Sequence, residues 1–200
     1  MIVVAIIGIA GVLLAARTGT FSYWSEEAFI RHLAETIQLL HEQAMQDGEY
    51  YRLEFSFKPA GFRAGIMKVE EDDASQELIE LSTDAGALSL ELAAFLNPSP
   101  GRVQTLIPPP SFPSLAEPVF APEGVEFTDI VNMSGKHVPA RDGNAAMMFS
   151  PRGFSEFAVI HLSLSSKAPV TLLVNPFTGL VDVFREYKEY EWTYGRQQKG

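Results

Sequence analysis

The first sixteen residues, Met1 to Ala16, contain no charged or strongly polar side chain. A block of this kind is held by a membrane or by a bundle of similar helices. At about 1.5 Å per residue it spans roughly 24 Å, slightly less than the ~30 Å of bilayer hydrocarbon. Small residues recur along it at helical spacing and would let other helices approach closely, although runs rich in alanine and glycine also show such stripes by chance. These candidate membrane- or fibre-packing positions are Ala5, Gly8, Val12 and Ala15.

The next segment, residues 17–47, has the pattern of an amphipathic helix that continues the apolar one. Its apolar residues recur at steps of three and four, which places them on one helix face. Charged and amide side chains occupy the opposite face. We expect the apolar face to dock the helix onto a β-sheet through Phe29, Leu33, Ile37 and Leu40.

Two features of this segment are typical of helix ends. Ser25 precedes two glutamates, as a hydroxyl cap followed by acids at the positive end of the helix dipole would. Asp47-Gly48 is typical of a helix stop. These signals leave room for a break between the apolar and amphipathic parts near Thr18 to Thr20.

Length and charge limit the classes of protein that fit. Two hundred residues suit one domain plus an anchor. The net charge is -10, and nucleic-acid binders need a basic face for the phosphates, so nucleic acid is not an expected partner. The chain contains no cysteine, which excludes disulfides and thiolate metal sites.

Residues 48–200 are expected to form a β-rich domain. Residues 50–57 alternate between apolar and polar side chains, the pattern of a half-buried strand, and Pro59 to Gly61 turns the chain toward a returning strand. With the N-terminal helix packed on antiparallel strands, the predicted fold class is α+β. The other predicted strands cover 65–69, 125–133, 145–149, 157–164, 170–174 and 180–184.

Two segments of this domain allow more than one interpretation. Residues 97–122 hold eight of the thirteen prolines and are predicted to be a long loop, because proline cannot join a sheet interior. Its Pro108–Pro110 run is either a docking ligand or a stiff surface connector. The aromatic tail either binds a partner or covers a sheet edge. The tail aromatics are Tyr187, Tyr190, Trp192 and Tyr194.

No motif in the chain supports an enzyme, a cofactor or a metal site. His41-Glu42 lacks the second histidine of a zinc helix, and Ser150 lacks the flanking glycines of a nucleophile elbow. The acidic run 70–73 lacks the spacing and glycine of a calcium loop, which favours a solvated turn over a cation site. We therefore look for function in how the chain is anchored and assembled.

Several of these features resemble one family. The block Met1 to Ala16 resembles the interior of the N-terminal helix of type IV pilins and pseudopilins, and the amphipathic continuation supports this. The Phe-x-Pro-x-Gly turn at 149–153 and the Thr-Gly turn within 175–181 are similar to those of H-type minor pseudopilins of type II secretion systems and FimT-like minor pilins.

The resemblance implies a structural protein that assembles into or caps a pseudopilus and so supports protein export. Its expected partners are other pseudopilins or pilins, the inner membrane, and the secretion or pilus assembly machinery. It implies a single-pass protein of the bacterial inner membrane with its domain in the periplasm, incorporated into a periplasmic fibre. Family members begin with a basic leader, a cleaved glycine and a methylated first residue. The given sequence shows none of these, and we expect them to be encoded upstream of Met1.

Three other interpretations remain open. The chain could be a minor pilin of a type IV pilus, or a single-span, membrane-anchored periplasmic binding domain unrelated to pili. A secreted protein with a signal peptide would have its mature N-terminus near Arg17, although no basic residue precedes the apolar run.

Overall fold

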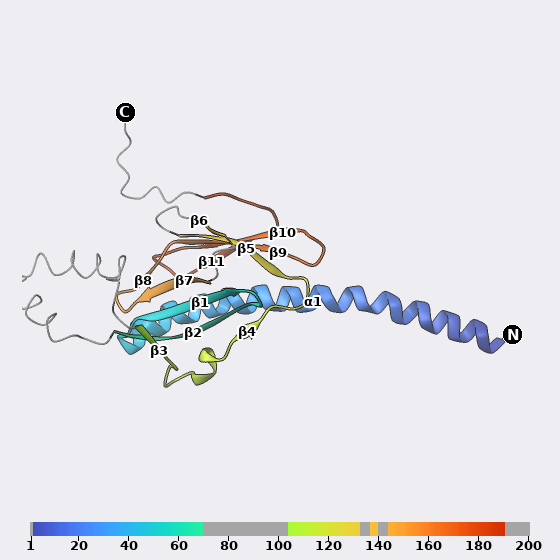
Figure 1. The fold of residues 1–200 in the computed structure, drawn as a ribbon, viewed down its shortest axis with the longest axis horizontal. Coiled ribbons are helices and arrows are strands. Elements are labelled where there is room, and N and C mark those ends of the chain that lie inside the picture. Colours follow the sequence, from blue (N-terminus) through green and yellow to red (C-terminus); the bar gives the residue numbers. More distant parts are fainter. Residues whose placement is uncertain (1, 70–103, 133–136, 140–143, 191–200) are drawn as a thin grey trace, which may run out of the picture.

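The computed structural model describes residues 2–69, 104–132, 137–139 and 144–190, and within the first helix it describes side chains from Tyr23 onward. One long helix, α1 (Ile2–Asp47), packs against two antiparallel β-sheets. The α+β class predicted from the sequence is confirmed. Figure 1 shows the C-terminal part of α1 beside the sheets and its N-terminal part extending beyond them.

Helix α1 is continuous over 46 residues, so the break considered near Thr18 to Thr20 is absent and Ser25 lies inside the helix. An internal glycine costs a helix only about 1 kcal/mol, whereas a break would create two further ends with unpaired backbone groups. The predicted stop is present. Gly48 adopts φ of 69°, and its N–H donates to the Ala44 carbonyl at 3.1 Å, as in a left-handed helix cap.

The first sheet has six strands in the order β3-β2-β1-β7-β8, with β4 also pairing with β2. Strands β1 and β2 form a hairpin whose two turn residues are Lys58 and Pro59, because Phe57 pairs with Ala60. Strand β1 buries every second side chain, as its alternating sequence predicts. The strands are β1 (Tyr51–Phe57), β2 (Ala60–Val69), β3 (Gln104–Ile107), β4 (Val119–Phe120), β7 (Asn144–Ser150) and β8 (Phe154–Ser155).

The second sheet has five strands in the order β11-β10-β9-β5-β6. Its pairs are antiparallel, and the edge strand β11 contacts α1. The strands are β5 (Glu126–Asn132), β6 (His137–Pro139), β9 (Ala158–Ser163), β10 (Pro169–Val174) and β11 (Val181–Phe184).

The Pro-rich segment 97–122 is not wholly a loop, which corrects the sequence-based prediction. It contains β3, the short 3-10 helix η2 (Pro113–Ala116) and β4. Both strands lie along one edge of β2 and contain no proline, because proline lacks the backbone donor that a ladder needs. Residues 97–103, the acidic run 70–73 and the segment 76–96 lie outside the described residues.

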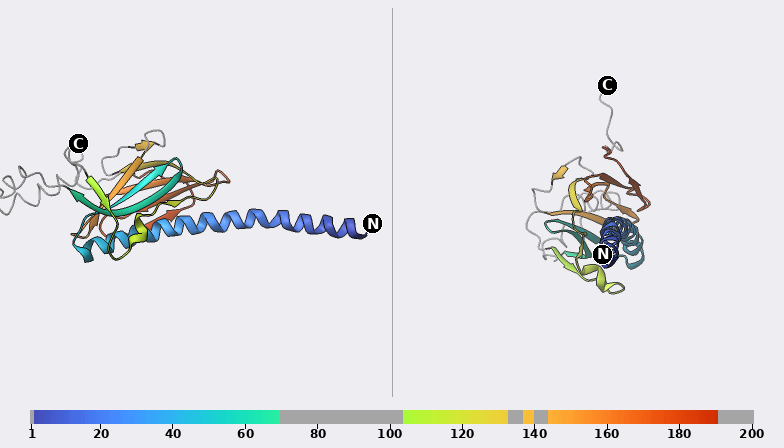
Figure 2. Two further views of the ribbon diagram at one scale, coloured as in Figure 1. Left: turned by 60° about the horizontal axis from the view of Figure 1, so that its bottom comes forward. Right: turned by 90° about the vertical axis from the view of Figure 1, so that its right-hand side faces the viewer.

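The main core lies between α1 and the two sheets, and Phe127 of β5 is at its centre. The Phe127 ring centroid lies 5.6 Å from that of Phe55, 6.2 Å from Phe57 and 6.3 Å from Phe29. These rings come from both sheets and from the helix, so one cluster joins all three parts. In the end-on view of Figure 2, the helix lies beside both sheets.

The turn between β10 and β11 places Gly179 in close contact with α1. A substitution at Gly179 therefore tests this packing. A Cβ on Gly179 would lie 2.6 Å from Cβ and Cγ of His41, and its φ is 68°. Gly48 has nearly the same φ, 69°, but open space around it. We expect Gly179→Ala to lower the free energy of unfolding by about 1–3 kcal/mol more than Gly48→Ala, measured by urea denaturation. Equal losses would mean that the turn moves freely away from the helix.

Candidate functional site

The four helix residues that the sequence assigns to sheet docking all lie in the main core. Leu33, Ile37 and Leu40 have no exposed surface, and Phe29 is 5% exposed. The ring of Phe29 also contacts Phe62 of β2 at a centroid distance of 5.7 Å. The C-terminal half of α1 is therefore held by an apolar face that contacts both sheets.

The helix also buries residues that the apolar pattern did not single out. Ile30 is buried beside Phe29, and Thr36, His41 and Gln43 are buried polar side chains. Burial lowers the pKa of His41, while the nearby Glu42 carboxylate opposes this shift. A buried imidazole under the β10–β11 turn is therefore favoured in its neutral form. Among the described residues, no group of three or more histidine or acidic side chains could hold a metal ion.

Polar contacts fix the position of the domain along the helix axis. Near the middle of α1, the Ser165 hydroxyl donates to the Glu26 carboxylate and the Arg185 guanidinium pairs with Glu27. At the other end of the packed half, the Tyr51 hydroxyl donates to Asp47 at 2.5 Å. Burial raises the pKa of Tyr51, and the Asp47 carboxylate adds to the shift. These contacts thus hold the domain on α1 between Glu26 and Asp47.

The N-terminal half of α1 lies beyond the sheets (Figure 1). The candidate packing positions belong to this half, where the backbone is helical and the side chains lie outside the described part. Among the residues whose side chains the structure describes, which in α1 begin at Tyr23, no helix has the length and hydropathy of a membrane span. Where this half meets the domain, Tyr23 and Trp24 are exposed by 58% and 66%. The packing positions are Ala5, Gly8, Val12 and Ala15.

On the second sheet, three polar side chains of adjacent strands lie side by side. His161 of β9 pairs in register with Thr171 of β10 and with Asp129 of β5. Nδ1 of His161 lies 2.9 Å from a carboxylate oxygen of Asp129, and Nε2 lies 2.9 Å from the backbone carbonyl oxygen of Lys188. Both ring nitrogens therefore lie close to oxygen atoms of neighbouring segments.

The tail after β11 lies over this row of side chains. The Thr171 hydroxyl donates to the Glu186 carbonyl at 2.8 Å and accepts from the Lys188 N–H at 3.1 Å. The Tyr187 ring stacks on His161 with centroids 4.3 Å apart, and burial raises the pKa of its hydroxyl.

Farther along the tail, Tyr190 packs against a small second cluster formed by Val131, Phe157 and Val159. The first two tail aromatics, Tyr187 and Tyr190, therefore lie over the inner strands β9 and β5 of the second sheet, rather than covering a sheet edge as considered from the sequence. Trp192 and Tyr194 lie outside the described residues.

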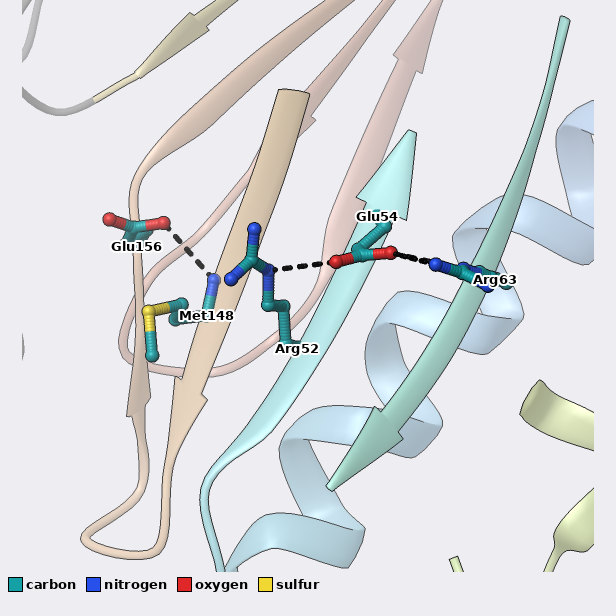
Figure 3. A network of polar contacts seen from close by, with 5 residues as sticks. All are labelled: Arg52, Glu54, Arg63, Met148 and Glu156. Atoms are coloured by element: carbon teal, nitrogen blue, oxygen red, sulfur yellow. Dashed lines mark hydrogen bonds and ion pairs between the residues drawn. The ribbon is translucent and has the colours of Figure 1, made fainter. Parts of the chain in front are cut away.

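The outer face of the first sheet carries a charged network (Figure 3). Glu54 pairs with Arg63 at 2.8 Å and with Arg52 at 3.3 Å. Beside them, the Glu156 carboxylate accepts from the Met148 N–H at 3.1 Å. Burial raises the pKa of Glu156, although the Met148 N–H and the positive charge of Arg52 oppose the shift. This network links neighbouring strands on the sheet surface.

Two open hollows lie on the first sheet. One, of about 340 Å³, is lined by Asp47, Lys68 and prolines 108 and 110. The other, of about 260 Å³, is lined by residues of β1, β2 and β4 that include Glu54 and Arg63. Pro109 is buried, so the polyproline run packs against the domain near the end of α1.

Comparison of the chain with models of known protein families, with curated proteins and with solved structures found no match. The inference of its function therefore rests on the geometry of the chain itself.

Truncating the docking face of α1 tests how strongly the helix holds the domain together. Leu33→Ala removes a fully buried side chain, and we expect the free energy of unfolding to fall by about 2–5 kcal/mol. Glu35→Ala, on the exposed face of the same turn, should change it by less than about 0.5 kcal/mol. Urea denaturation measures both. A loss for Leu33→Ala no larger than that for Glu35→Ala would show that the helix is not part of the cooperative core.

The buried carboxyl of Glu156 predicts a pH dependence of stability. Its raised pKa means that the folded state favours the neutral form. The resulting stability is complete below the ordinary glutamate pKa of about 4.3, and it is lost as pH rises through the folded-state pKa. Glu156→Gln keeps an acceptor for the Met148 N–H and removes the charge. We expect it to raise the thermal midpoint near about pH 7 and to leave it almost unchanged near about pH 4.

The matched control is Glu54→Gln, which removes a carboxylate that pairs with Arg63 and Arg52. This substitution should lower the thermal midpoint only slightly at neutral pH, because a solvent-accessible ion pair contributes little to the free energy of unfolding. If Glu156→Gln also lowered the midpoint at neutral pH, attraction between Glu156 and Arg52 would outweigh the cost of burying the carboxylate.

Proposed function

We propose that this protein is a structural minor pseudopilin of a type II secretion system, which assembles into or caps the pseudopilus and supports protein export. One observation carries the proposal: α1 is a single helix of 46 residues, held by the domain over one half and extending beyond it over the other. A fibre subunit needs this division, with one part to join neighbouring helices and another to carry the domain.

The length of the extending half suits an inner-membrane anchor. From Ile2 to Tyr23 there are 21 steps along the helix, which span about 32 Å at 1.5 Å per residue, enough to cover most of the ~30 Å of bilayer hydrocarbon and the headgroup layer on one side. The uncharged block Met1 to Ala16 occupies most of that length. In this proposal the helix resides in the inner membrane before assembly, with the domain in the periplasm.

Within the fibre, the same block would pack against helices of other pseudopilins. Gly8 and the alanines at 5 and 15 permit close approach of backbones, the main source of helix association where lipid and side chains are equally apolar. Because α1 has no break, a force on its apolar half reaches the core directly. The protein would thus act mechanically, with no chemical step of its own.

A charge in the apolar block tests the proposal. Ile9→Asp should abolish secretion in a strain that lacks the wild-type gene, because a charge at the centre of a bilayer costs at least about 2.5 kcal/mol. Ile9→Val, the matched control, should secrete normally. Normal secretion by Ile9→Asp at wild-type protein levels would refute the proposed role.

The cysteine-free chain offers a second readout that separates a fibre subunit from a solitary anchored domain. A single cysteine placed at Val12 should form disulfide cross-links with cysteines in the helices of other pseudopilins. A cysteine at the exposed Gln38, on the part of the helix beside the domain, is the comparison site. Absence of cross-links at Val12 in secreting cells would favour an anchored binding domain.

A further inference from the structure

Two large aromatic side chains are exposed next to each other where α1 leaves the domain. Tyr23 is 58% exposed and Trp24 is 66% exposed, and their rings meet edge to face at a centroid distance of 6.2 Å. The next helix aromatic toward the C-terminus, Phe29, is buried in the core. Tyr23 continues the spacing of the buried residues Glu26, Ile30 and Leu33, so the exposed pair lies beyond the part of the helix that docks on the sheets.

The domain ends just beyond this pair. The contacts of Glu26 with Ser165 and of Glu27 with Arg185 are made within one helical turn of Trp24. Toward its N-terminus, α1 extends beyond both sheets (Figure 1). Tyr23 and Trp24 thus mark the boundary between the domain and the extending half of the helix.

The charges of the sequence change sign at the same boundary. Residues 1–25 contain one charged side chain, Arg17, and no acid. The first acidic residue is Glu26, directly after the aromatic pair and Ser25. Since the whole chain carries -10 and Arg17 contributes +1, residues 26–200 carry -11. An acidic domain is repelled by anionic lipid, whereas a lone arginine beside an apolar block is attracted to lipid phosphates.

The spacing along the helix places the rings at the depth of lipid headgroups. Trp24 follows Ala16 by eight residues, about 12 Å along the axis. Helical side chains lean toward the N-terminus and cover the preceding turn, which brings the ring back by about 5 Å. If Ala16 lies at the edge of the hydrocarbon, the ring lies about 7 Å outside it, within a headgroup layer roughly 5–7 Å thick.

We propose that Tyr23 and Trp24 form an interfacial anchor that seats in the phospholipid headgroup layer and sets the height of the domain above the membrane. Tyrosine and tryptophan prefer this layer because their rings are apolar and their O–H and N–H groups are polar. The inference rests on the membrane-anchored state in the proposed function and adds the residues that fix its depth. Its partner is the bilayer surface.

Tryptophan fluorescence of the full chain tests this anchor. Trp192→Phe leaves Trp24 as the only tryptophan, and Trp24→Phe leaves Trp192 as the matched control. Each variant is reconstituted into phosphatidylcholine vesicles whose acyl chains carry bromine, a quencher, either near the headgroup or near the chain end. We expect Trp24 emission to shift to shorter wavelength and to be quenched more strongly by the shallow bromines. Emission from Trp192 should be quenched much less at either depth.

Flotation of the vesicles separates failure of this inference from failure of the proposed function. Protein that floats with vesicles while Trp24 keeps the emission of a water-exposed ring would overturn the interfacial anchor and leave the membrane-anchored function standing. Stronger quenching by the deep bromines would overturn it too, since the ring would then lie in the hydrocarbon. Protein that does not float would overturn both. Emission that changes only when other pseudopilins are added would replace lipid by a protein partner.

Discussion

Burial of one helix face against two sheets is the contact on which the rest of this structure depends. Leu33, Ile37 and Leu40 have no exposed surface, and each buried side chain of this size stabilises the fold by about 1.5–3 kcal/mol. The aromatic rings around Phe127 extend the same core into both sheets. Without α1, the core-facing side chains of both sheets would be exposed together, so helix and sheets stabilise one another.

This arrangement couples the extending half of α1 to the domain. The helix has no break, and the contacts at Glu26 and Glu27 hold it where it leaves the sheets. Farther along, Gly179 lies against His41 and fixes the β10–β11 turn on the helix. A domain held at two separated points cannot slide along the helix. Both the proposed fibre role and a fixed height above a membrane would require a domain that does not slide.

Much of this fold could be predicted from short-range patterns. Steps of three and four identified the docking face through Leu33 and Ile37, and alternation identified β1 and most later strands. The unbroken passage through Thr18 to Thr20 was missed because local cap signals at Ser25 were overridden by the cost of unpaired helix ends. The strands within 97–122 were missed because proline content concealed short runs that pair with β2.

The sequence by itself determined an apolar helix that continues into an amphipathic one, and a β-rich domain to cover it, because these depend on the periodicity of neighbouring residues. Only the tertiary structure decided that the strands form two sheets and that the Tyr187 ring stacks on His161. It also decided that Tyr23 and Trp24 stay uncovered at the end of the domain while Phe29 is buried. These outcomes depend on which distant segments meet, and local patterns do not encode such pairings.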